Sequence, residues 1–142
     1  MSESEPSRKG CVFCEIIDGK RENEIKYQDE KFVVFMDKRP ATKHHYLVVP
    51  RIHYKNVLSL KVDEVDLKMV KVGEQIMTEN KGDLSGLRMG FHWPPFHSIS
   101  HLHLHVIAPE EEMGLIARAI FKVNSYWFVH LIQYNIEILN LM

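Results

Sequence analysis

Three of the nine histidines of the chain stand at every second position of one short segment, HLHLHVI (residues 101–107). Successive side chains of a β-strand point to opposite faces, so an extended segment places His101, His103 and His105 together on one face. These imidazoles cannot all stay protonated near neutral pH, because like charges lower one another's pKa values. The segment predicts an open face with a neutral imidazole that acts as a base or nucleophile, or that binds zinc or iron.

A second group that could bind a metal or react is the pair of cysteines in CVFC. Cys11 and Cys14 are the two cysteines of the chain. In a reducing compartment this spacing is typical of a metal site or a redox pair rather than a structural disulfide. The simpler alternative is two buried thiols at the start of a helix.

The elements that position these residues follow from the spacing of apolar residues. Helical spacing predicts a short helix from Cys11 that ends near Gly19, and a long amphipathic helix over residues 62–80. A further helix is expected over residues 110–124. Strands are expected at 24–37 (two, meeting near Asp29), 45–50, 86–93 and 100–109. This mixture indicates an α+β protein with one antiparallel sheet of about five strands.

Several segments together resemble the histidine triad (HIT) superfamily. CVFCEII, YQDEKFVVFMD, HYLVVPRIH and HSISHLHLHVI match it in order and separation from about Cys11 to Pro109. The resemblance is closest to the nucleotide-binding phosphoramidase branch, in particular its third type, and the region around the triad also looks like the catalytic domain of aprataxin. It implies a HIT-like domain over residues 11–125, preceded by a flexible tail (1–10) and followed by an apolar segment (126–142).

The resemblance implies an enzyme whose central histidine, here His103, attacks the α-phosphorus of a nucleotide and forms a covalent intermediate that water hydrolyses. His105 matches the member that contacts the phosphate, and His101 the member that orients its neighbours. His45 matches a fourth histidine that fixes the tautomers of the triad. Ser98 matches a serine that contacts the phosphate or the leaving group.

The resemblance also implies a nucleoside site. Its apolar side chains would sandwich a purine, and an acid would accept hydrogen bonds from both ribose hydroxyls. The acid is Asp37. The nucleotide-binding positions are Val12, Phe13, Ile16, Phe35, Met36, Asp37 and Lys38, with Ser98, His103 and His105 at the phosphate. Spacing alone would place Phe13, Ile16 and Phe35 in the core.

Relatives with a Cys-x-x-Cys at this place hold zinc with two thiolates and two histidines. The matching residues are Cys11, Cys14, His53 and His101, a closed set of four ligands that would make the zinc structural rather than catalytic. The resemblance thus implies that the chemical step needs no cofactor and that a structural zinc pins the first helix to the sheet.

The chain departs from the phosphoramidase branch just before the triad. Gly90 stands near the place of an asparagine, Phe96-His97-Ser98 replaces Gly-Gln-Ser, and a Trp-Pro-Pro precedes the triad instead of lying near the C-terminus. His92 and His97 are additional histidines close to the expected phosphate, either as charges and acids or as exposed loop residues. The apolar segment at the end is expected to cover the sheet, to form an oligomer interface, or to pack poorly.

The resemblance implies an adenosine 5′-monophosphoramidase that hydrolyses AMP-lysine, AMP-NH2 and acyl-adenylates. The alternatives are aprataxin-like removal of AMP from adenylated nucleic-acid ends and a nucleotide-binding scaffold. The net charge of −1 and the sequence pI of about 6.8 argue against nucleic acid as a partner. The polar start and the lack of a run of about 18–20 apolar residues predict a cytoplasmic and nuclear protein with no membrane partner. A homodimer or larger oligomer is expected.

Overall fold

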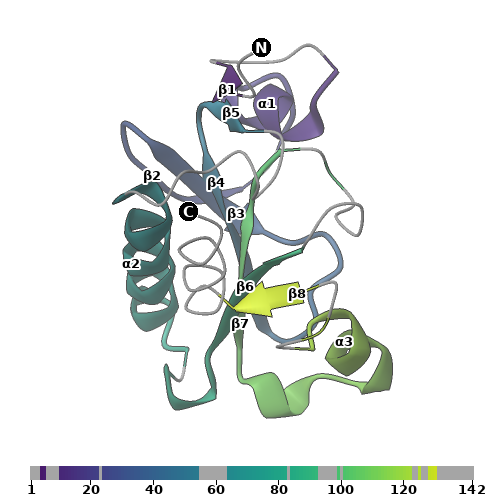
Figure 1. The fold of residues 1–142 in the computed structure, drawn as a ribbon. Helices are drawn as coiled ribbons and strands as arrows, with labels where there is room; N and C mark the ends of the chain where they lie inside the picture. The colour runs from purple at the N-terminus through teal and green to yellow at the C-terminus, as the bar shows by residue number, and fades with distance from the viewer. Residues whose placement is uncertain are drawn as a thin grey trace.

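The computed structural model describes residues 4–5, 10–22, 24–54, 64–82, 84–92, 99, 101–122, 125 and 128–130 (Figure 1). The elements are, in chain order, β1 (Ser4–Glu5), α1 (Val12–Ile17), β2 (Ile25–Gln28), β3 (Phe32–Met36), β4 (His44–Pro50), β5 (His53–Tyr54), α2 (Glu64–Glu79), the 3-10 turn η2 (Leu84–Gly86), β6 (Arg88–His92), β7 (Leu104–Ala108), the 3-10 turn η3 (Glu110–Glu112), α3 (Leu115–Ile120) and β8 (Phe128–His130).

The main sheet is antiparallel, with the strand order β2-β3-β4-β7-β6-β8, and β1 pairs separately with β5. The predicted α+β class with an antiparallel sheet is confirmed. The described sheet has six strands rather than about five, because β8, from the apolar C-terminal segment, pairs with β6. These three residues thus extend the edge of the sheet.

The register of the central strands decides which residues share a face. Leu47 of β4 pairs with Phe35 of β3 and with His105 of β7. These three residues therefore lie on one face of the sheet, and their sequence neighbours, such as Tyr46 and Val106, lie on the other.

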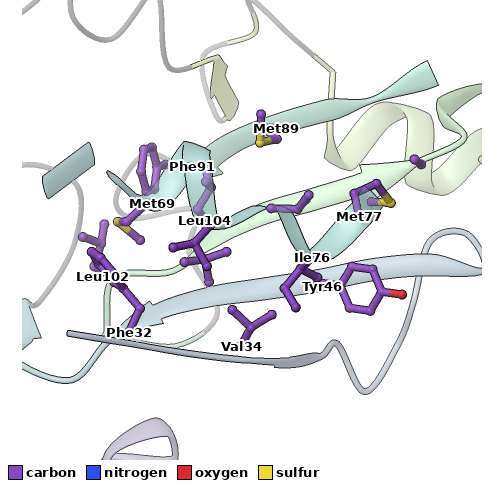
Figure 2. Packing of buried hydrophobic residues seen from close by; sticks show 14 residues of the cluster. Phe32, Val34, Tyr46, Met69, Ile76, Met77, Met89, Phe91, Leu102 and Leu104 are labelled. Carbon is purple, nitrogen blue, oxygen red and sulfur yellow. The ribbon is translucent and has the colours of Figure 1, made fainter. Parts of the chain in front are cut away.

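The face that carries Tyr46 and Val106 is covered by α2 (Figures 1 and 2). The helix contributes Met69, Val72 and Ile76, which are spaced by three and four residues, together with Met77, and all four are buried. They pack against a set of strand residues that includes Phe32, Val34, Tyr46, Val48, Met89, Phe91, Leu104 and Val106. This face of the sheet therefore packs against α2 and forms the hydrophobic core.

The opposite face carries two separate apolar clusters. Near α1, Phe13 and Ile16 pack on Val33, Phe35, Leu47 and Val49. Further along, Ile107 packs with Met113, Phe121 and Phe128. Since His45 and His105 share this face with Leu47, the histidines lie between the two clusters.

Two elements differ from the expectation. The helix expected over residues 110–124 is interrupted between η3 and α3, because Met113 is extended (φ −65°, ψ 134°) and buried in the second cluster, and Gly114 precedes α3 as its N-cap. Strand β7 begins at Leu104 rather than near residue 100. None of the described helices has the length and apolar character needed to cross a bilayer.

Candidate active site

The central histidine of the triad is held in one tautomer by the backbone. His103 Nδ1 lies 2.7 Å from the carbonyl oxygen of His101. A carbonyl oxygen can only accept, so Nδ1 carries the proton of the neutral ring and Nε2 carries the lone pair. The ring of Phe13 packs edge-on against this imidazole, with centroids 5.1 Å apart. In its neutral form the imidazole of His103 therefore presents the Nε2 lone pair, which is the tautomer that a nucleophilic histidine needs.

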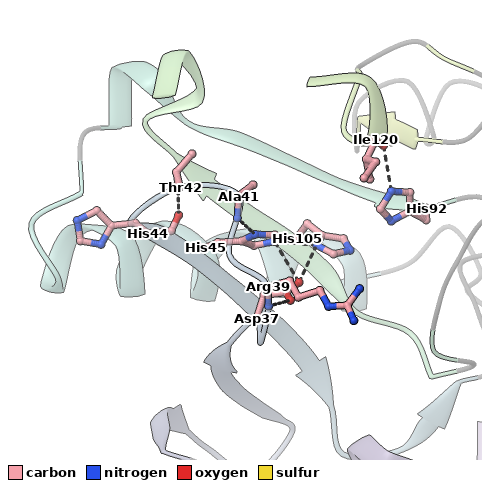
Figure 3. Close-up of polar contacts among 9 residues, drawn as sticks. All are labelled: Asp37, Arg39, Ala41, Thr42, His44, His45, His92, His105 and Ile120. Atoms are coloured by element: carbon pink, nitrogen blue, oxygen red, sulfur yellow. Dashed lines mark hydrogen bonds and ion pairs between the residues drawn. The ribbon is translucent and has the colours of Figure 1, made fainter. Parts of the chain in front are cut away.

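A second chain of hydrogen bonds fixes the tautomers of His45 and His105 (Figure 3). The backbone N–H of Ala41 donates to His45 Nδ1 at 2.9 Å, so the proton of the neutral ring lies on Nε2. His45 Nε2 then donates to His105 Nδ1 at 3.0 Å, which places the proton of His105 on its own Nε2. That buried Nε2 has no hydrogen-bond partner among the described residues. It is a preset donor for an incoming acceptor.

Burial keeps these rings neutral. It lowers the pKa of His45 to about 4, outweighing the opposing effect of the Asp37 carboxylate. Burial also lowers the pKa of His105 well below its usual value, with smaller contributions from His103, His45 and His92. At neutral pH the pair therefore offers an N–H donor and carries no charge.

Asp37, expected to bind ribose, lies directly against this pair. Its Oδ2 is 3.4 Å from His45 Nε2 and 3.9 Å from His105 Nδ1, while its Oδ1 accepts a hydrogen bond from the backbone N–H of Arg39. Its side chain is 22% exposed, so the carboxylate is reachable from solvent. Asp37 thus connects the histidine pair to the surface beside it (Figure 3).

Aromatic side chains from the C-terminal part of the chain surround His105. The Phe121 ring lies 4.9 Å and the Phe128 ring 6.1 Å from it, centroid to centroid. The ring of His92 lies 4.9 Å away and is anchored through a 3.1 Å contact between its Nε2 and the Ile120 carbonyl oxygen. Phe121 is tied in turn to β6, because Arg88 donates to its carbonyl oxygen at 3.1 Å. His92, one of the two additional histidines, is therefore part of the site.

The prediction of an open histidine face was wrong. His101, His103 and His105 are 0%, 7% and 5% exposed. Alternation correctly separates the histidines from Leu104 and Val106, but Phe13, Phe121 and Phe128 cover the histidine side as well. The sequence pattern shows which residues share a face and does not show what packs on that face.

The expected nucleoside residues fall into three groups. Phe13, Ile16 and Phe35 are buried in the cluster beneath α1, with Phe13 also touching His103. Val12 is partly buried next to them, and Lys38 is exposed one residue after Asp37. Met36 packs with the α2 cluster on the opposite face, so the structure does not bring it together with the triad. Ser98 and His97 lie outside the described residues, as does most of residues 1–10 and 126–142.

A second group of side chains lies close together, and we call it the Cys/His cluster: Cys11, Cys14, His53 and His101. Their ligand atoms all lie within 4.8 Å of one another. His101 Nδ1 is 3.3 Å from Cys11 Sγ and 3.4 Å from Cys14 Sγ, and His53 Nδ1 is 3.4 Å from Cys14 Sγ and 3.1 Å from His101 Nδ1. His101 Nε2 donates to the Pro50 carbonyl oxygen at 2.9 Å, which leaves its lone pair on Nδ1, facing the sulfurs.

The donor set of the Cys/His cluster fits zinc. Tetrahedral zinc, with Zn–S of about 2.3 Å and Zn–N of about 2.0–2.1 Å, separates its ligand atoms by about 3.3–3.8 Å. The four observed separations are 3.1–3.4 Å. The 3.1 Å separation of the two Nδ1 atoms is compatible with a shared cation as well as with a hydrogen bond. The carbonyl of Pro50 supplies the outer hydrogen bond that orients a ligating histidine.

Sequence reasoning missed the groups that set the tautomers and the covering rings. The former are backbone atoms, the carbonyl oxygens of His101 and Pro50 and the amide of Ala41. The latter are Phe121 and Phe128, which follow the triad by more than ten residues. Backbone groups carry no sequence signal, and no periodicity links the two phenylalanines to the histidines.

Burial of neutral His45 predicts a loss of stability in acid. Its pKa in the folded state, about 4, lies below the value near 6.5 expected when unfolded. The stabilisation is therefore complete above about pH 6.5 and is lost as the pH falls toward 4, with a maximum of roughly 3 kcal/mol. In urea titrations between pH 4 and 7, His45→Asn is expected to show a shallower loss in the free energy of unfolding than the wild type.

The matched control for this titration is His44→Asn, which removes a neighbouring imidazole from the other face of β4. It is expected to follow the wild-type pH dependence. Identical slopes for His45→Asn and the wild type would contradict the assignment of a buried neutral His45.

The chain is similar to known proteins over most of its length. The family model for "Scavenger mRNA decapping enzyme C-term binding" matches residues 10–120. The chain is 46% identical over 123 residues to adenosine 5′-monophosphoramidase HINT3 of Xenopus tropicalis, covering 84% of this chain and 80% of that protein. It is 42% identical to the Mus musculus protein of the same name, covering 90% and 81%.

A likeness to aprataxin of Ciona intestinalis is more distant, at 28% identity over 70% of this chain and 26% of that protein. Among solved structures, a histidine triad protein from Clostridium difficile superposes with a TM-score of 0.65 and 28% identity. The match covers 71% of this chain and 91% of that one.

Proposed function

Because the chain belongs to the histidine triad superfamily, we propose that it is an adenosine 5′-monophosphoramidase. It hydrolyses the P–N bond of AMP conjugates such as AMP-lysine and AMP-NH2, and also acyl-adenylates. The similarity to two proteins named for this activity, at 42–46% identity over most of the chain, supports the proposal. The main structural support is that two neighbouring rings offer complementary groups. The neutral ring of His103 has its lone pair on Nε2, and the Nε2–H of His105 has no hydrogen-bond partner among the described residues.

The proposed reaction has two steps. His103 Nε2 attacks the α-phosphorus, so that a bond from phosphorus to His103 forms as the bond to the substrate nitrogen breaks, and the amine leaves with a proton taken up from solvent. Water then attacks the same phosphorus, the bond from phosphorus to His103 breaks, AMP and the neutral imidazole are released, and the proton lost by the water returns to solvent. His105 donates its Nε2–H to a nonbridging phosphate oxygen, and the carbonyl of His101 stabilises the ring of His103 as positive charge develops.

The remaining residues serve binding in this proposal. Asp37 accepts from the ribose hydroxyls, next to the pair of His45 and His105 that it already touches. Val12 and Phe13 offer an apolar surface for the purine at the edge of α1, and Lys38 lies exposed beside Asp37. Ser98 remains assigned to the phosphate or leaving group by resemblance alone.

We also propose that the Cys/His cluster binds one zinc ion with a structural role. Four protein ligands leave no open position for substrate, so the ion would add folding stability and take no part in the chemical step. The hydrolytic rate should therefore not depend on added divalent metal.

The protein is proposed to act as a homodimer. The described residues of α3 include two large apolar side chains with high exposure, Leu115 at 88% and Ile116 at 78%. Exposed apolar side chains that lie together are typical of protein interfaces. Light scattering of the wild type and of Leu115→Asp tests this: the mass of a dimer is expected for the former and that of a monomer for the latter.

A panel of adenylates tests the activity. AMP-NH2, AMP-lysine, lysyl-adenylate and 5′-adenylated DNA are incubated with the protein, with and without magnesium, and AMP release is followed. The P–N conjugates are expected to react fastest, at rates independent of magnesium. Faster reaction of adenylated DNA would favour the aprataxin-like alternative, which the Ciona intestinalis match supports weakly. AMP binding with no release and no nucleotidyl-protein by mass spectrometry would favour a scaffold.

A further inference from the structure

One residue connects the Cys/His cluster to the proposed nucleophile. The ring of His101 faces both sulfurs, with Nδ1 3.3 Å from Cys11 Sγ and 3.4 Å from Cys14 Sγ. The backbone carbonyl of the same residue accepts the hydrogen bond that fixes the tautomer of His103. A change at the sulfurs that moves His101 therefore reaches His103 through a single hydrogen bond.

A second connection runs through α1. Cys11 is the N-cap of this helix and accepts a hydrogen bond from the Cys14 backbone N–H at 3.4 Å. Between the two cysteines stands Phe13, whose ring lies 5.1 Å from that of His103 and 5.9 Å from that of His101. The segment that carries the thiols thus also carries the ring that packs on the nucleophile.

The two thiols are placed to form a disulfide. Both are unoxidised, and the two sulfurs lie within 4.8 Å of each other. Positions three apart at the start of a helix have Cα atoms about 5 Å apart, inside the range of about 4.4–6.8 Å found for disulfides. Closing the bond to about 2.05 Å requires the sulfurs to turn away from His101 and His53 toward each other. Cys11 is only partly buried, so a small oxidant can reach it.

We propose that Cys11 and Cys14 form a reversible thiol–disulfide switch that turns the enzyme off; the inhibitory effect rests on the proposed function. With a hydroperoxide as oxidant, the Cys11 thiolate attacks the peroxide oxygen and becomes a sulfenic acid. Cys14 attacks that sulfur, the S–S bond forms and water leaves. Two thiols and one hydrogen peroxide give one disulfide and two waters, and a bound zinc ion would be released as its thiolate ligands disappear. A dithiol reductant reverses the step.

Inactivation follows from the geometry. The disulfide removes both sulfur partners of His101 Nδ1 and draws the start of α1 together. His101 and Phe13 lose the positions that hold His103, so its Nδ1–H is no longer fixed on the carbonyl of His101 and its two tautomers become mixed. Small displacements of a reacting group lower turnover by about 10- to 100-fold.

The experiment uses the full-length protein, reduced and then treated with hydrogen peroxide. Four quantities are measured: intact mass with peptide mapping, zinc release, the protonated nitrogen of His103 by long-range ¹H–¹⁵N correlation, and AMP-NH2 hydrolysis. Expected are the loss of two hydrogens at the linked Cys11 and Cys14, a change in the His103 pattern and a 10- to 100-fold fall in turnover. Dithiothreitol should restore the His103 spectrum and the turnover, because it reduces the disulfide and does not reverse methionine oxidation.

Cys11→Ser is the matched variant, because its turnover, whatever its level, should no longer respond to peroxide. An intramolecular disulfide that leaves the His103 spectrum and the turnover unchanged would overturn the proposal. So would failure of the disulfide to form at peroxide concentrations that oxidise glutathione. If the reduced protein hydrolyses no AMP conjugate, the proposed function fails, and the response of the His103 spectrum still decides whether the thiols control this residue.

Discussion

His103→Ala is expected to lower the turnover of AMP-NH2 by at least about 10³-fold, because it removes the group proposed to form the covalent bond to phosphorus. Nucleotide binding should change by no more than about fivefold, the effect of one lost hydrogen bond. The reason is structural: the His45–His105 pair is held by Ala41 and does not depend on the ring of His103. Calorimetric titration with AMP and steady-state hydrolysis separate the two effects.

The intermediate provides the decisive readout. Rapid quenching of the wild type with AMP-NH2 in excess should give a nucleotidyl adduct on the peptide that contains residue 103, and His103→Ala should give none. His44→Ala serves as the control, since His44 lies on the opposite face of β4 from His45 and contacts Tyr46. Hydrolysis that survives in His103→Ala would refute the assignment of the nucleophile.

Removal of the proposed zinc ion is expected to lower the midpoint of thermal unfolding by about 10–20 °C. A ligand present at a thousandfold excess over its Kd contributes about 4 kcal/mol, and 1 kcal/mol shifts the midpoint of a domain of this size by about 4 °C. The loss should be this large because the Cys/His cluster joins α1, the end of β4 through Pro50, and the start of the triad segment.

Scanning calorimetry with and without a strong chelator measures this shift, and elemental analysis gives the zinc content. Cys14→Ser should unfold at about the temperature of the chelated wild type and should not respond to chelator. A protein that contains no metal after purification in zinc, with the same midpoint in both conditions, would contradict a structural zinc.

The sequence predicted the architecture where local patterns decide it. Alternation in residues 32–36 and 104–108 correctly assigned the faces of β3 and β7, and turn residues around Asp29 separated β2 from β3. It failed at Met113 and Gly114, where burial of Met113 against Ile107 overrides the helical spacing of the segment. Tertiary contacts of this kind leave no periodic signal.

At the site, residue types and spacing identified the histidines and the cysteines, and His45 and His53 were found through resemblance. The resemblance also implied different roles for them, with His101 in the zinc set and His45 beside the triad, but it could not show which group meets each ring nitrogen. The ring of His101 faces the sulfurs and its backbone carbonyl faces His103, whereas His105 pairs with His45. These differences arise from which backbone group happens to face each nitrogen, and that depends on the packed structure.

The pairing of β6 with β8 limits how two copies can merge their sheets. Strand β8 pairs with β6 over Gly90–His92, and β7 pairs with the other side of β6 over Arg88–Gly90. The edge strands of the main sheet, among the described residues, are therefore β2 and β8. If two copies join through β8, the strand at the two-fold axis is the one that carries Phe128, whose ring contacts His92 and His105. Each subunit would then stabilise the position of Phe128 beside the histidines of its neighbour.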